Sequence, residues 1–342
     1  MRILFIDSVC AGPYQACSLE QTGLGGTEAT VIRISEGLAR RGHTVTVAQN
    51  GRQQLDVSSG GVRYVPYRYK AQPLGSTPQV VVNVRSHKIM PWLRRAFPTS
   101  RLCLWLHCFP GTRRRRLLEM AQRYNFGIVT VSRHHRRWVL DHERTPDKAK
   151  LSHLIKAIYN PVPDYVRAIR RPVRRDKLVF FSSPHKGLAQ VLSTFAHLHR
   201  RWPELRLYVA NPGYLLDAPA AGGQEVIALG PLTHHQVLEQ VAEAFCVLYT
   251  QSKFAETFGL VLAEANALGT PVLCHPLGAA PEILHQPDAQ LVNADDPAAV
   301  EARLALWRTR GRPRVAGDRR FCLERILDRW EEVLMRQYLE AA

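Results

Sequence analysis

Short apolar runs alternate with amphipathic helical patterns along most of this chain, and this alternation restricts the possible folds more than any other feature. RILFID (2–7) is typical of a buried strand. TEATVIRISEGLARRG (27–42) places Val31, Ile34 and Leu38 on one helical face, and Gly42 follows where the helix is expected to stop. A strand–helix–strand alternation predicts a parallel sheet with helices on both faces.

The same alternation continues to about residue 142. We expect further strands at 44–48, 62–67, 79–84, 101–107 and 126–132, and helices at about 112–124 and 133–142. The pattern breaks at 160–176, which holds three prolines and five arginines with little apolar periodicity, and this segment is predicted to be an inter-domain linker with a short helical piece.

A second alternation follows the linker. It predicts strands at 177–182, 205–210, 245–250 and 271–274, and helices at 185–202, 234–244, 258–269 and 321–339. A chain of 342 residues also fits two domains of about 170 residues better than one. We therefore predict an α/β protein with two doubly wound parallel-sheet domains in tandem, whose ligands bind at the carboxyl ends of the strands.

Charge is distributed very unevenly between the two halves. Residues 1–175 hold 30 Lys and Arg against 10 Asp and Glu, whereas residues 176–342 hold 16 against 19. A basic half suggests an anionic partner such as nucleic acid, an acidic membrane or a phosphorylated substrate. The alternative is a solvated arginine-rich surface without a partner.

The cysteines and the apolar segments indicate a reduced, cytoplasmic protein. The seven cysteines are odd in number, and none forms a Cys-x-x-Cys pair. The apolar start is too short and lacks the basic segment of a signal peptide. No apolar stretch is long enough to span a membrane.

The segment FAETFGLVLAEANALGTPVL (254–273) is the richest in chemical information. Glu256 is expected in a loop after a strand, and Phe258 and Gly259 at the start of a helix, where free N–H groups favour a phosphate. Glu264 lies among alanines and leucines, an unusual setting for a solvated acid. The alternative is that Glu256 is a helix N-terminal charge and Glu264 a surface residue.

This segment resembles the Glu-x7-Glu signature of retaining glycosyltransferase family 4, the glycogen-synthase-like and sucrose-synthase-like group with the GT-B fold. Other stretches are similar to that family in the same order and cover nearly the whole chain. They are GLGGTEATVIRISEGLARRGHTVTV (23–47), WLHCFPG (105–111), TVSRHH (130–135), IYNPVP (158–163), SSPHKGL (182–188), LGPLTHHQVLEQV (229–241) and GTPVLCHPLGAAPEIL (269–284).

The resemblance implies a layout for the domains. Residues 1–165 form an acceptor-binding Rossmann-like domain, 166–320 form the nucleotide-sugar-binding domain, and 321–342 form a helix that returns to the first domain. The two domains are expected to face a cleft.

The resemblance also implies roles for residues at the donor. Glu256 binds the sugar hydroxyls, Glu264 the ribose, and Lys186 the diphosphate as its charge develops. The backbone amides of Phe258 and Gly259 complete the diphosphate cradle, and His107 lies near the donor sugar. The further donor residues are Ser182, Ser183, Leu260 and Leu232.

The resemblance leaves the role of the N-terminal loop more open. Gly25 and Gly26 are expected to approach the donor phosphate or the acceptor, with Thr27 and Glu28 facing the cleft, although Thr27 and Glu28 also fit a plain helix start. The chain departs from the family near Phe181, where the family has an arginine on the diphosphate. Ser182 and Ser183 carry no charge there, so another arginine must substitute or the stabilisation is weaker.

Neither a metal nor a cofactor is expected. The chain has no Asp-x-Asp motif, and its fourteen histidines show no zinc-like spacing. The resemblance implies front-face transfer with retention, in which the leaving phosphate helps to deprotonate the acceptor. The predicted substrates are a nucleotide sugar and a carbohydrate or lipid-linked acceptor, in polysaccharide or glycolipid biosynthesis.

The basic half suggests a dock on anionic lipid at the inner face of the cell membrane, through Arg113–Arg116, the arginines at 133, 136 and 137, and those from Arg167 to Arg175. Two alternatives remain. One is a non-catalytic scaffold of the same fold. The other is a nucleic-acid-binding protein, against which stands the lack of a reading motif and of exposed aromatics among the basic residues.

Overall fold

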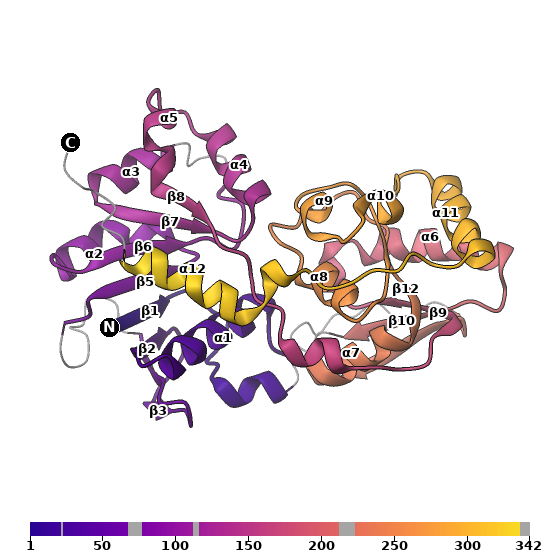
Figure 1. Cartoon of the computed structure of the whole chain (residues 1–342), viewed down its shortest axis with the longest axis horizontal. Coiled ribbons are helices and arrows are strands. Elements are labelled where there is room, and N and C mark those ends of the chain that lie inside the picture. The colour runs from indigo at the N-terminus through magenta and orange to yellow at the C-terminus, as the bar shows by residue number, and fades with distance from the viewer. Residues whose placement is uncertain (22, 68–76, 112–115, 212–222, 336–342) are drawn as a thin grey trace. The chain divides into compact units, whose positions relative to one another are not determined.

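The computed structural model describes residues 1–21, 23–67, 77–111, 116–211 and 223–335 (Figure 1). The chain divides into two compact units. The first unit contains Met1–Ala16, Thr27–Pro161 and the segment from Leu323 onward. The second contains Cys17–Gly26 and Val162–Cys322. The main crossing from one unit to the other therefore lies within the proline- and arginine-rich segment 160–176.

The first unit is built on an eight-stranded sheet with the order β3-β4-β2-β1-β5-β6-β7-β8. All neighbouring strands are parallel except the short edge strand β3, which pairs antiparallel with β4. The strands are β1 (Arg2–Asp7), β2 (Thr44–Gln49), β3 (Asp56–Val57), β4 (Arg63–Pro66), β5 (Val80–Val84), β6 (Arg101–Trp105), β7 (Phe126–Thr130) and β8 (Ile155–Ala157).

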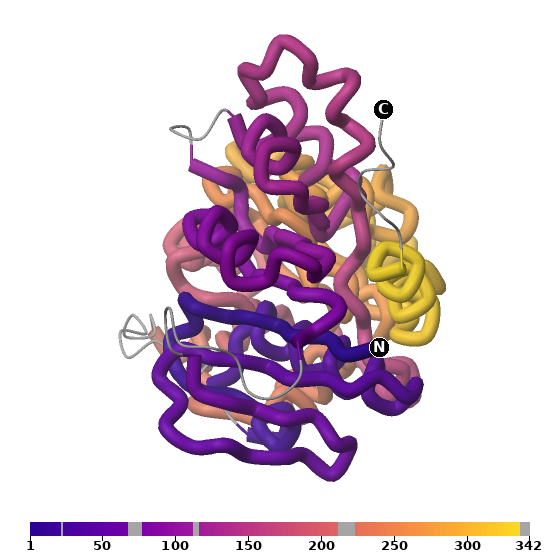
Figure 2. Tube along the Cα trace, turned by 90° about the vertical axis from the view of Figure 1, so that its left-hand side faces the viewer, coloured from indigo at the N-terminus to yellow at the C-terminus, as the bar shows by residue number. Residues whose placement is uncertain are grey.

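Helices cover both faces of this sheet because successive side chains of each strand point to opposite sides. Leu4 and Ile6 of β1 join a buried core with residues of α2 (Met90–Ala96), α3 (Leu117–Arg123) and α4 (Arg133–His142). Phe5 instead faces Trp330 of α12 (Leu323–Met335), with ring centroids 6.4 Å apart. Figure 2 shows α12, in yellow, beside the strands of this unit.

Helix α1 (Gly26–Arg40) is linked to α12 by ion pairs. Arg41, which directly follows α1, contacts Glu324 at 2.6 Å and Glu331 at 2.8 Å. The other helical segments of the first unit are η2 (His87–Ile89), α5 (Lys148–Leu151) and η3 (Ser152–Leu154), whereas η1 (Ala16–Glu20) belongs to the second unit from Cys17 onward.

The second unit has a five-stranded parallel sheet with the order β11-β10-β9-β12-β13. Helix α7 lies on one side of the sheet, and α6 and α11 lie on the other, as right-handed crossovers require (Figure 1). The strands are β9 (Arg174–Phe180), β10 (Arg206–Asn211), β11 (Val226–Pro231), β12 (Ala244–Tyr249) and β13 (Val272–Cys274). The helices are η4 (Asp164–Ala168), η5 (Pro184–Lys186), α6 (Leu188–Arg201), α7 (His234–Glu243), α8 (Leu260–Ala267), α9 (Ala280–Ile283), α10 (Pro287–Gln290), α11 (Pro297–Arg310) and η6 (Arg319–Phe321).

Each sheet has one point at which its strand order reverses. In the first unit the chain proceeds from β1 to β2 and β4 on one side and from β5 to β8 on the other, so the reversal lies between β1 and β5. In the second unit it lies between β9 and β12. Ligands of doubly wound sheets bind at these switch points, outside the carboxyl ends of the strands.

The predicted fold class, two doubly wound α/β domains, is confirmed, whereas several element boundaries differ from the predictions. Strand β9 begins at Arg174, inside the predicted linker, and the helix expected at 185–202 is divided into η5 and α6. Strands β3, β8 and β11 and helices α2, α5, α9, α10 and α11 were not predicted. Parts of the helices expected at 112–124 and 321–339 lie outside the described residues. Among the described helices, none is both long and apolar enough to cross a membrane.

Candidate functional site

Two residues with a predicted catalytic role meet at the switch point of the second unit. Lys186 ends η5 after β9, and Glu256 lies in the loop after β12. The Lys186 ammonium lies 2.9 Å from Glu256 Oε1 and 3.1 Å from Oε2, and 4.8 Å from the centre of the Phe254 ring. Glu256 is 7% exposed, so a nearly buried carboxylate is neutralised by a partly exposed ammonium.

Tyr249 forms a hydrogen bond with the same Glu256 carboxylate. Its hydroxyl, at the end of β12, donates a hydrogen bond of 2.8 Å to Glu256 Oε1. Burial first, and then the adjacent negative charge of Glu256, raise the pKa of Tyr249 far above its ordinary value, so the phenol keeps its proton. Tyr249 also forms a hydrogen bond with Ser182. Glu256 is therefore oriented from both neighbouring strands.

The backbone around Glu256 requires glycine at two positions. A Cβ on Gly278 would lie 2.6 Å from the Glu256 carbonyl oxygen, and the φ of Gly278 is +65°. Gly259 has a φ of +88° and caps the N-terminus of α8. Both conformations disfavour residues with a Cβ. The first turn of α8 thus follows directly from the loop that carries Glu256, and a helix N-terminus favours an anion.

Glu264 does not join the Lys186–Glu256 pair but has partners of its own. It lies in α8 and is 4% exposed. His234 Nε2, at the start of α7, is 3.0 Å from Glu264 Oε1, and the Tyr165 hydroxyl is 2.9 Å from His234 Nδ1. Because the carboxylate only accepts, Nε2 carries a proton, and in a neutral ring Nδ1 then accepts a hydrogen bond from the Tyr165 hydroxyl. Tyr165 and His234 were not predicted from the sequence, since the chain brings them to Glu264 from distant segments.

The other predicted donor residues surround this switch point. Ser182 and Ser183 are buried in the turn after β9, and the Ser183 carbonyl accepts from the Lys186 N–H at 2.9 Å. Phe258 was expected in the helix but lies outside it. It precedes Gly259 and is buried against the ring of Phe321 at 5.1 Å.

Leu260 is the first residue of α8, and Leu232 is half-buried just before the N-cap of α7. Phe181, where the family has an arginine, is 9% exposed and follows the end of β9.

The N-terminal glycine loop divides between the two units. Cys17–Gly26 groups with the second unit, and a Cβ on Gly26 would lie 3.0 Å from Leu260 Cδ1 at the start of α8. From Thr27 onward the chain belongs to the first unit. Glu28 there forms an ion pair with Arg85 at 2.9 Å, a partner that the sequence analysis did not foresee.

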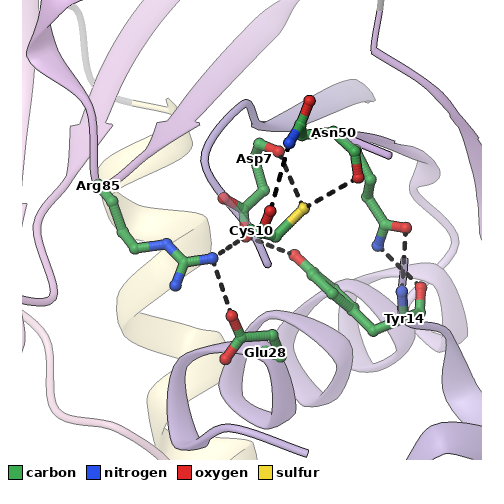
Figure 3. A network of polar contacts seen from close by, with 7 residues as sticks. Asp7, Cys10, Tyr14, Glu28, Asn50 and Arg85 are labelled. Atoms are coloured by element: carbon green, nitrogen blue, oxygen red, sulfur yellow. Dashed lines mark hydrogen bonds and ion pairs between the residues drawn. The ribbon is translucent and has the colours of Figure 1, made fainter. Parts of the chain in front are cut away.

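A second polar cluster lies at the switch point of the first unit (Figure 3). Asp7 ends β1 and Arg85 directly follows β5, and the Arg85 guanidinium contacts Asp7 Oδ2 at 2.5 Å as well as Glu28. The Tyr14 hydroxyl donates to Asp7 Oδ2 at 3.0 Å. Burial raises the pKa of Asp7, although Arg85 opposes this effect. Burial, with a smaller effect of the Asp7 charge, raises the pKa of Cys10 to about 11.

His107 lies two residues after β6, in the first unit. The centres of its ring and of the Trp105 ring are 4.4 Å apart. Burial lowers its pKa well below the ordinary value, and the positive charges of Arg85 and His135 add to this effect. A neutral imidazole is therefore favoured at the carboxyl edge that also carries Asp7 and Arg85.

The arginines assigned to a membrane dock fall into two groups. Those from Arg167 to Arg175 have partners within the second unit, among them Glu239 for Arg171 and the Arg308 carbonyl for Arg175. Arg133 and Arg137 on α4 are exposed, whereas Arg136 donates to the carbonyls of Ile155 and Ser152. Arg113–Arg115 lie outside the described residues, and Arg116 is exposed.

Comparison with known proteins gives one family and several relatives. Residues 175–307 match the family described as glycosyl transferases group 1. The chain is 26% identical over 335 residues to the phosphatidyl-myo-inositol mannosyltransferase of Mycobacterium tuberculosis, with 82% of each chain covered.

Solved structures share the fold of the whole chain. Anabaena Alr3699/HepE in complex with UDP and glucose has a TM-score of 0.68 at 17% identity, with 98% of this chain and 99% of that chain covered. Sucrose-phosphate synthase from Thermosynechococcus elongatus has a TM-score of 0.65 at 16% identity, covering 98% and 97%. The expected resemblance to GT-B glycosyltransferases is thus confirmed for the fold of the chain, and residues 175–307 are similar to the glycosyl transferases group 1 family.

Proposed function

We propose that this protein transfers a hexose from a nucleoside-diphosphate sugar to a hydroxyl acceptor, with retention of the anomeric configuration. The observation that carries the proposal is the Lys186–Glu256 ion pair at the switch point of the second unit, next to the N-terminus of α8. An ammonium and a helix N-terminus suit a diphosphate, and a carboxylate suits sugar hydroxyls.

The chemistry follows from these positions. Lys186 leaves Glu256 to meet the diphosphate, where its charge stabilises the leaving group as the glycosidic bond breaks. Glu256 then accepts hydrogen bonds from the hydroxyls of the donor sugar, while Tyr249 keeps the carboxylate in place. Glu264, fixed by His234, binds the ribose through its second oxygen. His107 contributes a neutral imidazole near the donor sugar.

Retention is proposed to occur by front-face attack. A double-displacement mechanism needs a carboxylate nucleophile opposite a second catalytic carboxyl group about 5 Å away. In the second unit, Glu256 is held by Lys186 and Tyr249, and Glu264 is held by His234. We therefore assign the acceptor proton to the leaving phosphate oxygen. With Lys186 and α8 facing the diphosphate, we propose that the reaction needs neither a metal nor a cofactor.

The acceptor is proposed to be carbohydrate or lipid-linked, and the site of action the inner membrane surface. The named relative acts on phosphatidyl-myo-inositol, and exposed cations gather on α4 and α5. We assign no nucleic-acid partner. A non-catalytic scaffold is the other reading of this fold, and the retained Lys186–Glu256 pair speaks against it.

The proposal is tested with UDP, GDP, ADP, dTDP and their hexose conjugates in a thermal-shift screen. A ligand at 100 times its dissociation constant stabilises the folded state by about 2.7 kcal/mol. We expect one nucleotide to raise the melting temperature. Its sugar conjugate should then release nucleoside diphosphate with acceptor present and EDTA added, and NMR should show a product that keeps the donor's anomeric configuration. Binding without any turnover would instead indicate the scaffold.

A further inference from the structure

Three charged side chains meet at the switch point of the first unit, and we call Asp7, Glu28 and Arg85 the β1–β5 triad. Asp7 and Arg85 come from the carboxyl ends of adjacent parallel strands, in which Ile6 pairs with Asn83. One guanidinium nitrogen of Arg85 contacts both Asp7 Oδ2 and Glu28 Oε1 (Figure 3). This is the place at which a doubly wound sheet binds a ligand.

The triad has hydrogen-bonding capacity that the protein does not use. Asp7 is 0% exposed, and its Oδ1 atom has no hydrogen-bond partner among the described residues. The same holds for Arg85 Nε. Leaving a buried polar group without a partner costs about 1–3 kcal/mol, so such groups are uncommon in folded proteins. One buried acceptor atom and one buried donor atom of the cluster thus lack a hydrogen-bond partner among the described residues.

The backbone at Arg85 is also unfavourable by itself. Its φ is +67°, a left-handed conformation that residues with a Cβ rarely adopt. Such strain persists where the surrounding structure holds it and is concentrated at functional sites. Here the two carboxylates hold the guanidinium, so the strained residue is a fixed part of the cluster.

The charges of the triad determine the kind of ligand that it can hold. Two carboxylates surround one guanidinium, and the nearby His107 favours its neutral form. Within the triad, therefore, no positive charge is left over for a phosphate. Carboxylate oxygens accept hydrogen bonds from hydroxyls, and a guanidinium donates to them. The side chains of Arg85 and Glu28 are 20% and 17% exposed, so they form a rim above the buried Asp7.

We propose that the β1–β5 triad binds an uncharged polyhydroxylated ring of the acceptor, with hydroxyls donating to Glu28 and accepting from Arg85 at the rim, while the buried Asp7 holds the guanidinium in place. Only the identification of this ring as part of the acceptor rests on the proposed function. Polyol binding by the first unit can be measured independently of it. A phosphate carried by the acceptor lies elsewhere.

The test measures dissociation constants by saturation-transfer NMR, with and without the nucleotide found in the thermal screen. The neutral probes are myo-inositol, glucose, mannose and glycerol. The charged probes are myo-inositol 1-phosphate and glucose 6-phosphate. Glu28→Gln is the principal variant because Glu28 lies at the rim, and Asp7→Asn is the second. Asp141→Asn, exposed on α4, is the matched control.

We expect at least one neutral cyclic polyol to bind, and Glu28→Gln to raise its dissociation constant about tenfold, as for the loss of one charge-assisted hydrogen bond. The nucleotide-induced shift in melting temperature should stay the same in this variant, and the control should match the wild type. If no polyol binds the wild type, if Glu28→Gln changes affinity less than twofold, or if phosphorylated probes bind tenfold more tightly than their neutral parents, the inference is wrong.

Failure of the proposed function would look different. The wild type would then show no nucleotide shift and release no nucleoside diphosphate, while polyol binding and its sensitivity to Glu28→Gln would remain. A loss of folding in Asp7→Asn, seen by circular dichroism, leaves Glu28→Gln to decide the question.

Discussion

The two switch points occupy the same topological place in their sheets and differ in how their charges are balanced. In the second unit one ammonium faces one carboxylate, Lys186 with Glu256, and a tyrosine supports the acid. In the first unit one guanidinium serves two acids, and polar atoms remain without partners among the described residues. The first arrangement suits an anionic diphosphate, whereas the second suits neutral hydroxyls. One fold thus offers two chemically distinct sites.

Removing the ammonium should cause the largest effect on activity. In Lys186→Ala the diphosphate loses its cation, and removal of one such stabilising group lowers kcat by about 100- to 1000-fold. The measurement is the release of nucleoside diphosphate under saturating donor. Arg310→Ala, exposed at the end of α11, is the control and should retain full activity. A decrease of less than tenfold would remove Lys186 from the leaving-group role.

Removing the guanidinium of the β1–β5 triad should instead have its main effect on stability. In Arg85→Ala the buried Asp7 loses its counter-charge and Glu28 faces a like charge, and breaking a buried pair on one side costs about 3 kcal/mol. Urea unfolding measures the change. Arg123→Ala, exposed at the end of α3, should change stability by less than about 0.5 kcal/mol. Equal stability of the two variants would show that the triad does not behave as a buried network.

Sequence patterns located the second switch point much better than the first. Strand–helix alternation predicted the strands of both sheets except β3, β8 and β11, and the Glu-x7-Glu spacing together with the Lys-Gly stretch pointed to Lys186 and Glu256. These two residues lie in short segments whose order along the chain matches that of the family. Strands β2, β3, β4 and β5 and helix α1 lie between Asp7 and Arg85 in the chain, and each residue alone is only a charge after an apolar run. Their pairing depends on β5 lying beside β1, which a single sequence does not reveal.

His234 and Tyr165 were missed for a similar reason. His234 stands in a run of two histidines at a helix start, and nothing local connects it to Glu264. Helix α11 was missed because its apolar residues, Val300, Leu304 and Trp307, stand among alanines and arginines, so the periodic signal is weak. A carboxylate in an apolar helix, such as Glu264, is the one signal that indicated a buried partner.

The histidines of the two units provide a pH test of the same comparison. In the second unit His234 contacts a carboxylate, whereas in the first unit His135 is buried with its Nε2 3.1 Å from the Cys108 carbonyl and its Nδ1 accepting from the Val131 N–H. A neutral ring satisfies both bonds, and a second ring proton would face an N–H group. Burial therefore lowers the pKa of His135 to about 4, from an ordinary value of 6.5.

Because its pKa is lower in the folded than in the unfolded state, the neutral His135 ring contributes to the free energy of unfolding above pH 6.5. This contribution is lost as the pH falls towards 4. Between pH 7 and pH 5, the wild type should lose about 2 kcal/mol of unfolding free energy relative to His135→Gln, because protonation favours the unfolded chain. Urea unfolding at several pH values measures the difference. His153→Gln, exposed on η3, should follow the wild-type curve. Parallel curves for His135→Gln and the wild type would contradict the buried neutral ring.

The smallest effect concerns the exposed cations of the first unit. Arg133, Arg137, Lys148 and Lys150 are exposed on α4 and α5, and Lys150 also pairs with Asp147 at 3.4 Å. In the second unit, Arg171 pairs with Glu239 and Arg175 donates to the Arg308 carbonyl. A cation near an anionic membrane contributes about 1 kcal/mol, which is about fivefold in affinity. Each change to serine on α4 or α5 should therefore weaken binding to phosphatidylserine vesicles about fivefold at 0.1 M salt, measured by co-sedimentation. Arg171→Ser and Arg175→Ser should bind as the wild type does, because these arginines belong to the second unit and not to the α4–α5 surface. Equal losses in both groups would show that net charge, and not the α4–α5 surface, attracts the lipid.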